Sequence, residues 1–192
     1  MLKQLYERRA RRDLAHALHT RVIEQARRPH FYAVLGVPDT MLGRYEMVCL
    51  HAYLVLTRLK REGEAGACVA QTLHNILFDD FDVALRETGL GDMGIGKRIK
   101  KLARNLHGRI SAYDSGVSAS DKELAAALSR NMYASAEPSN AQVTGMVAYV
   151  RAARREIDDC PAAALFAAAR AFPDPEAFAP IDTPVRGTEF TQ

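Results

Sequence analysis

The segment from residue 40 to 61 constrains the fold most, because its apolar residues cover almost the whole circumference of a helix. One set of apolar residues recurs at helical spacing and a second set widens the stripe: Met41, Tyr45, Val48, Ala52, Val55 and Leu59, then Met47, Leu50 and Leu54. A helix that is apolar on most sides is stable only when other elements surround it. The sequence therefore predicts a central helix inside a bundle.

The other segments carry the same helical periodicity. We expect helices over residues 2–28, 30–35, 65–87, 93–116, 121–133 and 140–158, and a short helix after Pro161. The segment 65–87 should bury one stripe: Val69, Leu73, Ile76, Leu77, Phe81 and Ala84. "SDKE" at 120–123 and "SNAQ" at 139–142 are typical capping boxes at helix starts. No stretch alternates apolar and polar residues between turn signals, as a strand would.

These patterns predict an all-α, single-domain bundle of about six to eight helices with an irregular C-terminal tail. A chain of 192 residues fits one compact domain, which we expect over residues 1–170. Residues 171–192 contain four prolines and little periodicity. We expect this tail to be flexible or to wrap the surface of the bundle.

The segment "GLGDMGIGKR" at 89–98 matches two phosphate-binding patterns, G-x-G-x-x-G and G-x-x-x-x-G-K. Both patterns bind nucleotides only after a β-strand, whereas the helical segment "FDVALRE" precedes the glycines here. The second pattern also needs Ser or Thr after the lysine to hold magnesium, and this chain has Arg98 after Lys97. We therefore predict a connection between helices and no nucleotide cofactor.

Residues that bind metals or catalyse reactions form no informative pattern. The acidic stretch "HNILFDDFD" scatters its histidine and aspartates around a helix, which indicates a solvated face. His51 lies in the most apolar helix without a second ligand four residues away, so a hydrogen-bonded core or interface histidine is expected. Cys49, Cys68 and Cys160 form no pair of metal-ligand or disulfide spacing. We expect neither an enzyme nor a metal or cofactor site.

A basic run, "KRIKKLARNLHGR" at 97–109, contains no acidic residue. Such a run is usually a solvated helix face. The run has an apolar stripe, and its polar face carries only positive charges. This pattern also suits a helix that docks on an acidic protein, ribosomal RNA or anionic lipid headgroups.

The N-terminal sequence "MLKQLYERRARRDLAHALHT" lacks the apolar stretch of a secretory signal, and Glu7 and Asp13 are atypical of a transit peptide. The longest apolar run, at 47–56, is too short to cross a bilayer. We therefore expect a cytoplasmic protein, with peripheral contact to the inner membrane through its basic residues.

Several segments together resemble the ubiquinol-cytochrome c chaperone family, whose members are assembly factors of the cytochrome bc complex (complex III). The resemblance covers residues 1 to about 155. Its most specific segments are "ARRPHFY", "GVPDT" followed by "GRYEM", "LH" at 50–51, "LRETGLGD" and "GKRIKKLA", with "GR" and "AYD" after it. In this context the glycine stretch is a family signature.

The resemblance implies an all-helical chaperone that binds newly made cytochrome b or its soluble loops. Mitochondrial members act with a small partner protein near the ribosomal tunnel exit, and this chain resembles a bacterial member. The signature segments and the basic run supply the candidate partner-binding residues: Arg44, Glu46, Arg86, Asp92, Lys97, Lys100, Lys101 and Arg104. The alternative function is a ribosome- or RNA-binding helical domain that uses the basic helices.

Overall fold

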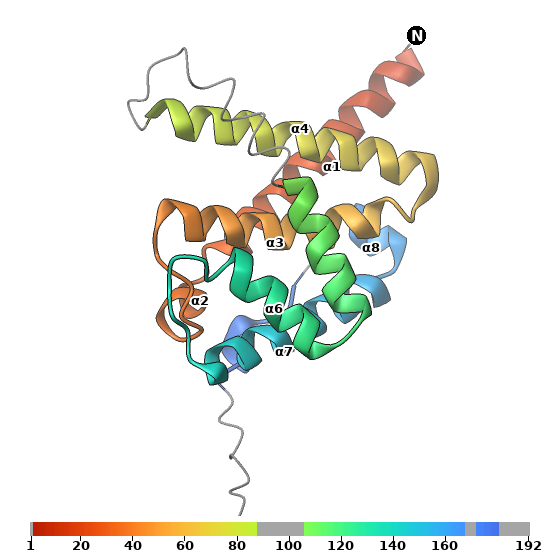
Figure 1. Cartoon of the computed structure of the whole chain (residues 1–192). Coiled ribbons are helices and arrows are strands. Elements are labelled where there is room, and N and C mark those ends of the chain that lie inside the picture. The colour runs from red at the N-terminus through yellow and green to blue at the C-terminus, as the bar shows by residue number, and fades with distance from the viewer. Residues whose placement is uncertain (1, 88–105, 168–171, 181–192) are drawn as a thin grey trace, which may run out of the picture.

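The computed structural model describes residues 2–87, 106–167 and 172–180, and it gives no side-chain description for 2–4 and 85–87. All regular structure in these ranges is helical, and the predicted all-α fold with an irregular C-terminal tail is confirmed. The elements, shown in Figure 1, are α1 (Leu2–Ala26), α2 (Pro29–Ala33), α3 (Met41–Leu59), α4 (Gly63–Glu87), a helix over 106–118, α6 (Asp121–Asn131), α7 (Asn140–Asp159), α8 (Ala162–Phe166) and the 3-10 turn η1 (Pro175–Ala177).

The helix starts follow the predicted caps. Ser139 and Gln142 form a complete capping box at α7, and the Ser120 hydroxyl accepts a hydrogen bond from the Glu123 amide at α6. The helix predicted over 93–116 is described only from residue 106, and it continues to residue 118. The glycine segment 89–98 lies outside the described residues.

Helix α3 forms the centre of the molecule, as its apolar circumference predicts. It packs against α1 and α4 on one side and against α7, which pairs with α6, on the other (Figure 1). Of its 19 residues 15 are buried, so almost no side of this helix contacts water. In the described part of the chain, no helix combines the length and apolar character needed to span a bilayer.

The first turn of α3 is fixed by a close approach of the preceding turn. The Thr40 hydroxyl caps the helix by accepting a hydrogen bond from the Gly43 amide at 3.2 Å. A Cβ atom at Gly43 would lie 1.9 Å from the Pro38 carbonyl oxygen, so only glycine fits here. This contact sets the direction in which the chain enters α3.

His51 lies at the centre of a buried hydrogen-bond chain. Its Nδ1 lies 2.8 Å from the Met47 carbonyl, which can only accept, so Nδ1 carries the proton. Its Nε2 then accepts a hydrogen bond from the Tyr149 hydroxyl at 2.7 Å. The Gln25 amide donates to the same hydroxyl oxygen at 3.0 Å. The expected hydrogen-bonded core histidine is confirmed, and it connects α1, α3 and α7.

Residues 172–180, which we call the C-terminal strap, pack on the end of α1, on the first half of α7 and on α2. Three side chains bind it: Gln25 donates to the Pro173 carbonyl at 2.9 Å, Arg28 pairs with Asp174 and Glu176 at 2.9 Å each, and His30 bonds the Phe178 carbonyl at 2.6 Å. Gly145 lets the Ala179 carbonyl approach α7 closely. The expected domain boundary at 170/171 falls outside the described residues and stays a prediction. Residues 181–192 of the expected tail also lie outside them.

The replacement Gly43→Ala should destabilise the fold by about 1–3 kcal/mol, because the new methyl group overlaps the Pro38 carbonyl. Gly108→Ala is the matched control, since nothing lies within 4 Å of a Cβ atom at this helical position. It should stabilise the helix by roughly 0.5–1 kcal/mol. Urea unfolding of both variants measures the difference, and equal effects of the two alanines would contradict the close packing at Gly43.

Stability should fall as the pH drops from 6.5 towards 4, because burial lowers the pKa of His51 to about 4. The unfolded chain, with an ordinary histidine pKa, binds the proton first in this window, and the loss should reach about 3 kcal/mol. His51→Gln should remove most of this dependence of the free energy of unfolding on pH. A smaller slope should remain, because burial also lowers the pKa of His19 and His74. Identical pH profiles of the two proteins in chemical unfolding would contradict the assignment.

Candidate functional site

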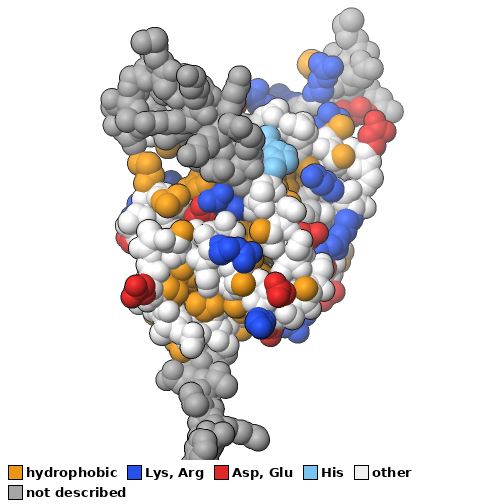
Figure 2. All heavy atoms as spheres, viewed as in Figure 1, with side chains coloured by type: hydrophobic (Ala, Val, Ile, Leu, Met, Phe, Trp, Pro, Cys, Tyr) orange, Lys and Arg blue, Asp and Glu red, His pale blue; other side chains and the backbone are white. Residues whose placement is uncertain are grey.

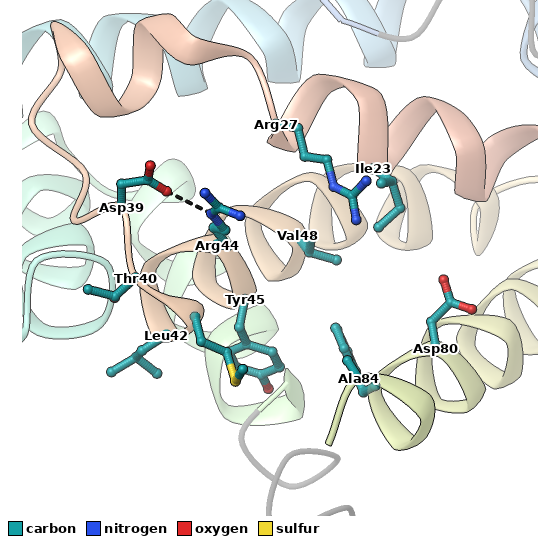
Figure 3. A pocket seen from close by; sticks show the side chains of 12 residues that line it. Ile23, Arg27, Asp39, Thr40, Leu42, Arg44, Tyr45, Val48, Asp80 and Ala84 are labelled. Atoms are coloured by element: carbon teal, nitrogen blue, oxygen red, sulfur yellow. Dashed lines mark hydrogen bonds and ion pairs between the residues drawn. The ribbon is translucent and has the colours of Figure 1, made fainter. Parts of the chain in front are cut away.

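A groove with a cavity volume of about 730 Å³ lies between the end of α1, the start of α3 and the second half of α4 (Figure 3). We call its apolar lining the floor and its charged lining the rim. The floor consists of Ile23, Met41, Leu42, Tyr45, Val48, Phe81 and Ala84, and the rim consists of Arg27, Asp39, Arg44 and Asp80.

The floor exposes large apolar side chains to solvent. Met41 is 60% exposed and Leu42 is 48% exposed, although both are in the first turn of the central helix. Figure 2 shows hydrophobic side chains at the surface over the start of α3, on a face that also carries arginine and lysine side chains. A contiguous apolar surface bordered by charged groups is typical of an interaction site.

Two predicted core positions are wrong, and both belong to the floor. The periodicity assigns Met41 and Ala84 to buried stripes, whereas both are exposed. Each stripe extends beyond the region that described helices cover, so Met41 at the start of one stripe and Ala84 at the end of the other face the groove. Met41, Tyr45 and Val48 are spaced i, i+4 and i+7 and lie along one face of α3.

The rim carries positively and negatively charged side chains, some on the α1 and α3 side of the groove and one on the α4 side. Arg44 pairs with Asp39 at 2.7 Å, and this guanidinium lowers the pKa of the Asp39 carboxyl. On the α4 side, Asp80 lies 2.9 Å from Nε2 of His19. Burial lowers the pKa of His19, and Asp80 opposes this change. The Arg27 side chain forms no ion pair with any residue that the structure describes.

Beneath the floor, a buried ion pair joins α3 to the helix 106–118. Arg109 binds both carboxylate oxygens of Glu46, whose side chain is 1% exposed. Burial raises the pKa of Glu46, and the hydrogen bonds from Arg109 oppose this change. The Arg109 guanidinium also lies 5.6 Å from the centre of the Tyr45 ring, which packs edge-on against Phe81 at 5.0 Å. The pair therefore positions the aromatic part of the floor.

The structure describes the side chains of two of the eight predicted partner-binding residues, Arg44 and Glu46, and they lie in different environments. Arg44 lies on the rim, whereas Glu46 is in the interior with its carboxylate occupied by Arg109. The Arg86 side chain and the whole of Asp92, Lys97, Lys100, Lys101 and Arg104 lie outside the described residues. Leu106, which follows that segment, packs beside Tyr45 and Cys49, so the described chain resumes next to the floor.

The described ranges show no arrangement of side chains suited to a metal ion. They contain no cluster of three or more His, Cys, Asp or Glu residues that could hold a metal ion. The acidic stretch of α4 is divided, since Asp80 faces His19 on α1 while the His74 ring packs on Phe78 at 4.5 Å. Cys49 is buried, Cys68 and Cys160 are half-buried, and all three are free thiols.

Comparison with known proteins gives one consistent result. The family model described as ubiquinol-cytochrome C chaperone matches residues 33–172. The ubiquinol-cytochrome c reductase complex assembly factor 1 of Mus musculus is 26% identical over 141 residues, which are 73% of this chain and 48% of that protein. The Xenopus laevis protein of the same name is 25% identical over 134 residues, 70% of this chain and 67% of its own length. The chain thus spans about half of the mouse relative and about two thirds of the frog one.

A solved structure is more similar in sequence than these relatives are. The crystal structure of the Cbp3 homolog from Brucella abortus superposes with a TM-score of 0.83 and is 38% identical. The match covers 93% of this chain and 99% of the Brucella chain. It includes the helical arrangement that forms the groove, because almost the whole chain is aligned.

The replacement Arg109→Met should destabilise the protein by about 3–5 kcal/mol, since it leaves the Glu46 carboxylate buried without a partner. The double variant Glu46→Leu/Arg109→Met is the control, because it removes both charges and keeps apolar volume. Its free energy of unfolding should lie within about 1 kcal/mol of that of the unmodified protein. A double variant as unstable as Arg109→Met would show that the guanidinium acts through Tyr45 and not through Glu46.

Proposed function

The chain belongs to the ubiquinol-cytochrome c chaperone family, and from this premise we propose that it supports assembly of ubiquinol-cytochrome c reductase by binding newly made cytochrome b. The names of its curated relatives support the first part of the proposal, because they describe assembly factors of that complex. The protein acts as a binding protein that holds a client, without catalysis.

The groove between α1, α3 and α4 is the observation that carries this proposal. An assembly chaperone must hold an incompletely assembled protein reversibly, which requires an accessible apolar surface with charged borders. Two floor residues are well exposed, Met41 at 60% and Leu42 at 48%, and the rim supplies both charges. Lys97, Lys100, Lys101 and Arg104 stay candidate recognition residues, and Leu106, where the described chain resumes, packs beside Tyr45.

One feature of α1 favours the alternative, a ribosome- or RNA-binding domain. Its N-terminal half extends beyond the body of the molecule in Figure 1 and exposes Arg8, Arg9 and Arg12. Binding to RNA through these arginines would weaken steeply with salt because counterions are released. Binding of a client in the apolar groove would keep most of its affinity, so a salt titration of the captured partner separates the two functions.

Deletion of the gene should lower the amount of assembled complex III while the cytochrome b transcript stays at its normal level. Blue native electrophoresis and transcript quantification measure the two quantities in the same cells. Expression of the intact chain should restore the complex. A normal amount of complex III in the deletion strain would overturn the proposed function.

A photo-crosslinking amino acid at Leu42 should capture cytochrome b during its synthesis, because this floor residue is 48% exposed in the groove. The same crosslinker at Lys122 is the control, since this exposed residue lies at the start of α6, across α3 from the groove. Mass spectrometry of the adducts identifies the captured protein. Equal capture from both positions would show that the groove is not the client site.

A further inference from the structure

Arg27 is the rim residue whose charge has no described counterpart. It follows the last residue of α1 and lines the groove, where Figure 3 shows its side chain extending between Ile23 and Arg44. Arg44 already pairs with Asp39, and Asp80 lies against His19. Because burial lowers the pKa of His19, Asp80 keeps a negative charge on the α4 side. Arg27 is the positive charge on the α1 side, beside the apolar floor, that has no ion pair with a described residue.

A second cavity repeats this placement of charge. It has a volume of about 520 Å³ and is lined by Arg27, Arg44, Asp39 and Tyr32. Arg27 therefore lies on the border between the two cavities and lines both of them. Both guanidiniums also lower the pKa of the Tyr32 hydroxyl, against the larger effect of burial. The border is thus a positively charged position that a negative group can reach from the groove.

The shape of the floor favours a helix as the occupant. Met41, Tyr45 and Val48 lie on one face of α3 at spacing i, i+4 and i+7. Met41 is 60% exposed, whereas Tyr45 and Val48 line the bottom of the groove and are 9% and 8% exposed. Phe81 of α4 packs against the Tyr45 ring there. A stripe of this kind packs against an incoming helix whose apolar residues have the same spacing. The groove is itself formed by three helices, α1, α3 and α4. A bound helix would pack against the start of α3, which α1 and α4 leave uncovered.

We propose that the groove binds an amphipathic helix of the client whose apolar face covers the floor and which carries a carboxylate beside that face, paired with Arg27. The inference rests on the proposed function and specifies the chemistry of the segment that the chaperone recognises. The apolar floor supplies most of the affinity, and the Arg27 pair selects for an acidic flank.

Two synthetic peptides of about 16 residues test this selectivity, a length that gives about four helical turns. Both carry leucines at i, i+3, i+4 and i+7. One carries glutamates beside the leucine face and the other carries lysines at the same positions. Fluorescence anisotropy with the full chain should show about tenfold tighter binding of the glutamate peptide at low salt, and a smaller preference at high salt.

Three variants test which residues cause the preference for the glutamate peptide. Arg27→Glu should reverse the preference in favour of the lysine peptide. Arg21→Glu is the matched control, because Arg21 is an exposed arginine of α1 that pairs with Glu24 and does not line the groove; it should keep the original preference. Met41→Asp should weaken the binding of both peptides. It should leave the midpoint of thermal unfolding nearly unchanged, since this side chain is 60% exposed.

Equal affinity for the two peptides, or an unchanged preference in Arg27→Glu, would overturn the inference. Displacement of the glutamate peptide by phosphatidylglycerol vesicles or by poly(A) RNA would also overturn it and assign the rim to lipid or RNA. These results are independent of the proposed function. Loss of complex III in the deletion strain without any peptide preference would contradict only the acidic helix, whereas normal complex III would contradict the chaperone function itself.

Discussion

The burial of α3 on almost every side is the constraint on which the rest of the structure depends. This helix carries three polar side chains into the interior, Glu46, His51 and Arg58. A buried polar group without a partner costs several kcal/mol, so each must be hydrogen-bonded by a neighbouring element. Glu46 binds Arg109, His51 binds Tyr149, and Arg58 donates to carbonyls at the end of α7. These three contacts fix the helix 106–118 and α7 around α3 in one arrangement.

The groove is a consequence of the same arrangement. Helices α1 and α4 cover most of one side of α3 and diverge from its first turn, where Met41 and Leu42 stay exposed. The buried Glu46 and Arg109 pair holds the Tyr45 ring from below, and Phe81 packs on the ring from α4. A binding surface of this kind requires no strained backbone or catalytic group. It requires only that two apolar stripes be longer than the helices that cover them.

The sequence predicts the parts of the fold that depend on local chemistry. The helices, the caps at Ser120 and Ser139 and the central position of α3 follow from spacing and from side chains within a few residues. The floor and the ion pair could not be predicted in this way. Glu46 and Arg109 are 63 residues apart, and a charged residue in an apolar helix looks the same whether it faces solvent or a buried partner. Arg27 has no sequence signal at all, because its importance comes from its place in the groove and from the lack of an ion pair with any described residue.

The C-terminal strap has a consequence for the order in which the protein is made. Gln25, Arg28 and His30 bind strap residues that lie 146 to 148 positions later in the chain. At translation rates of about 5–20 residues per second, the partners of these three side chains are synthesised roughly 7 to 30 seconds later. The ends of α1 and α2 therefore leave the ribosome long before the segment that covers them. Contacts of such high sequence separation form late in folding, so the core around His51 is closed only when synthesis of the chain is nearly finished.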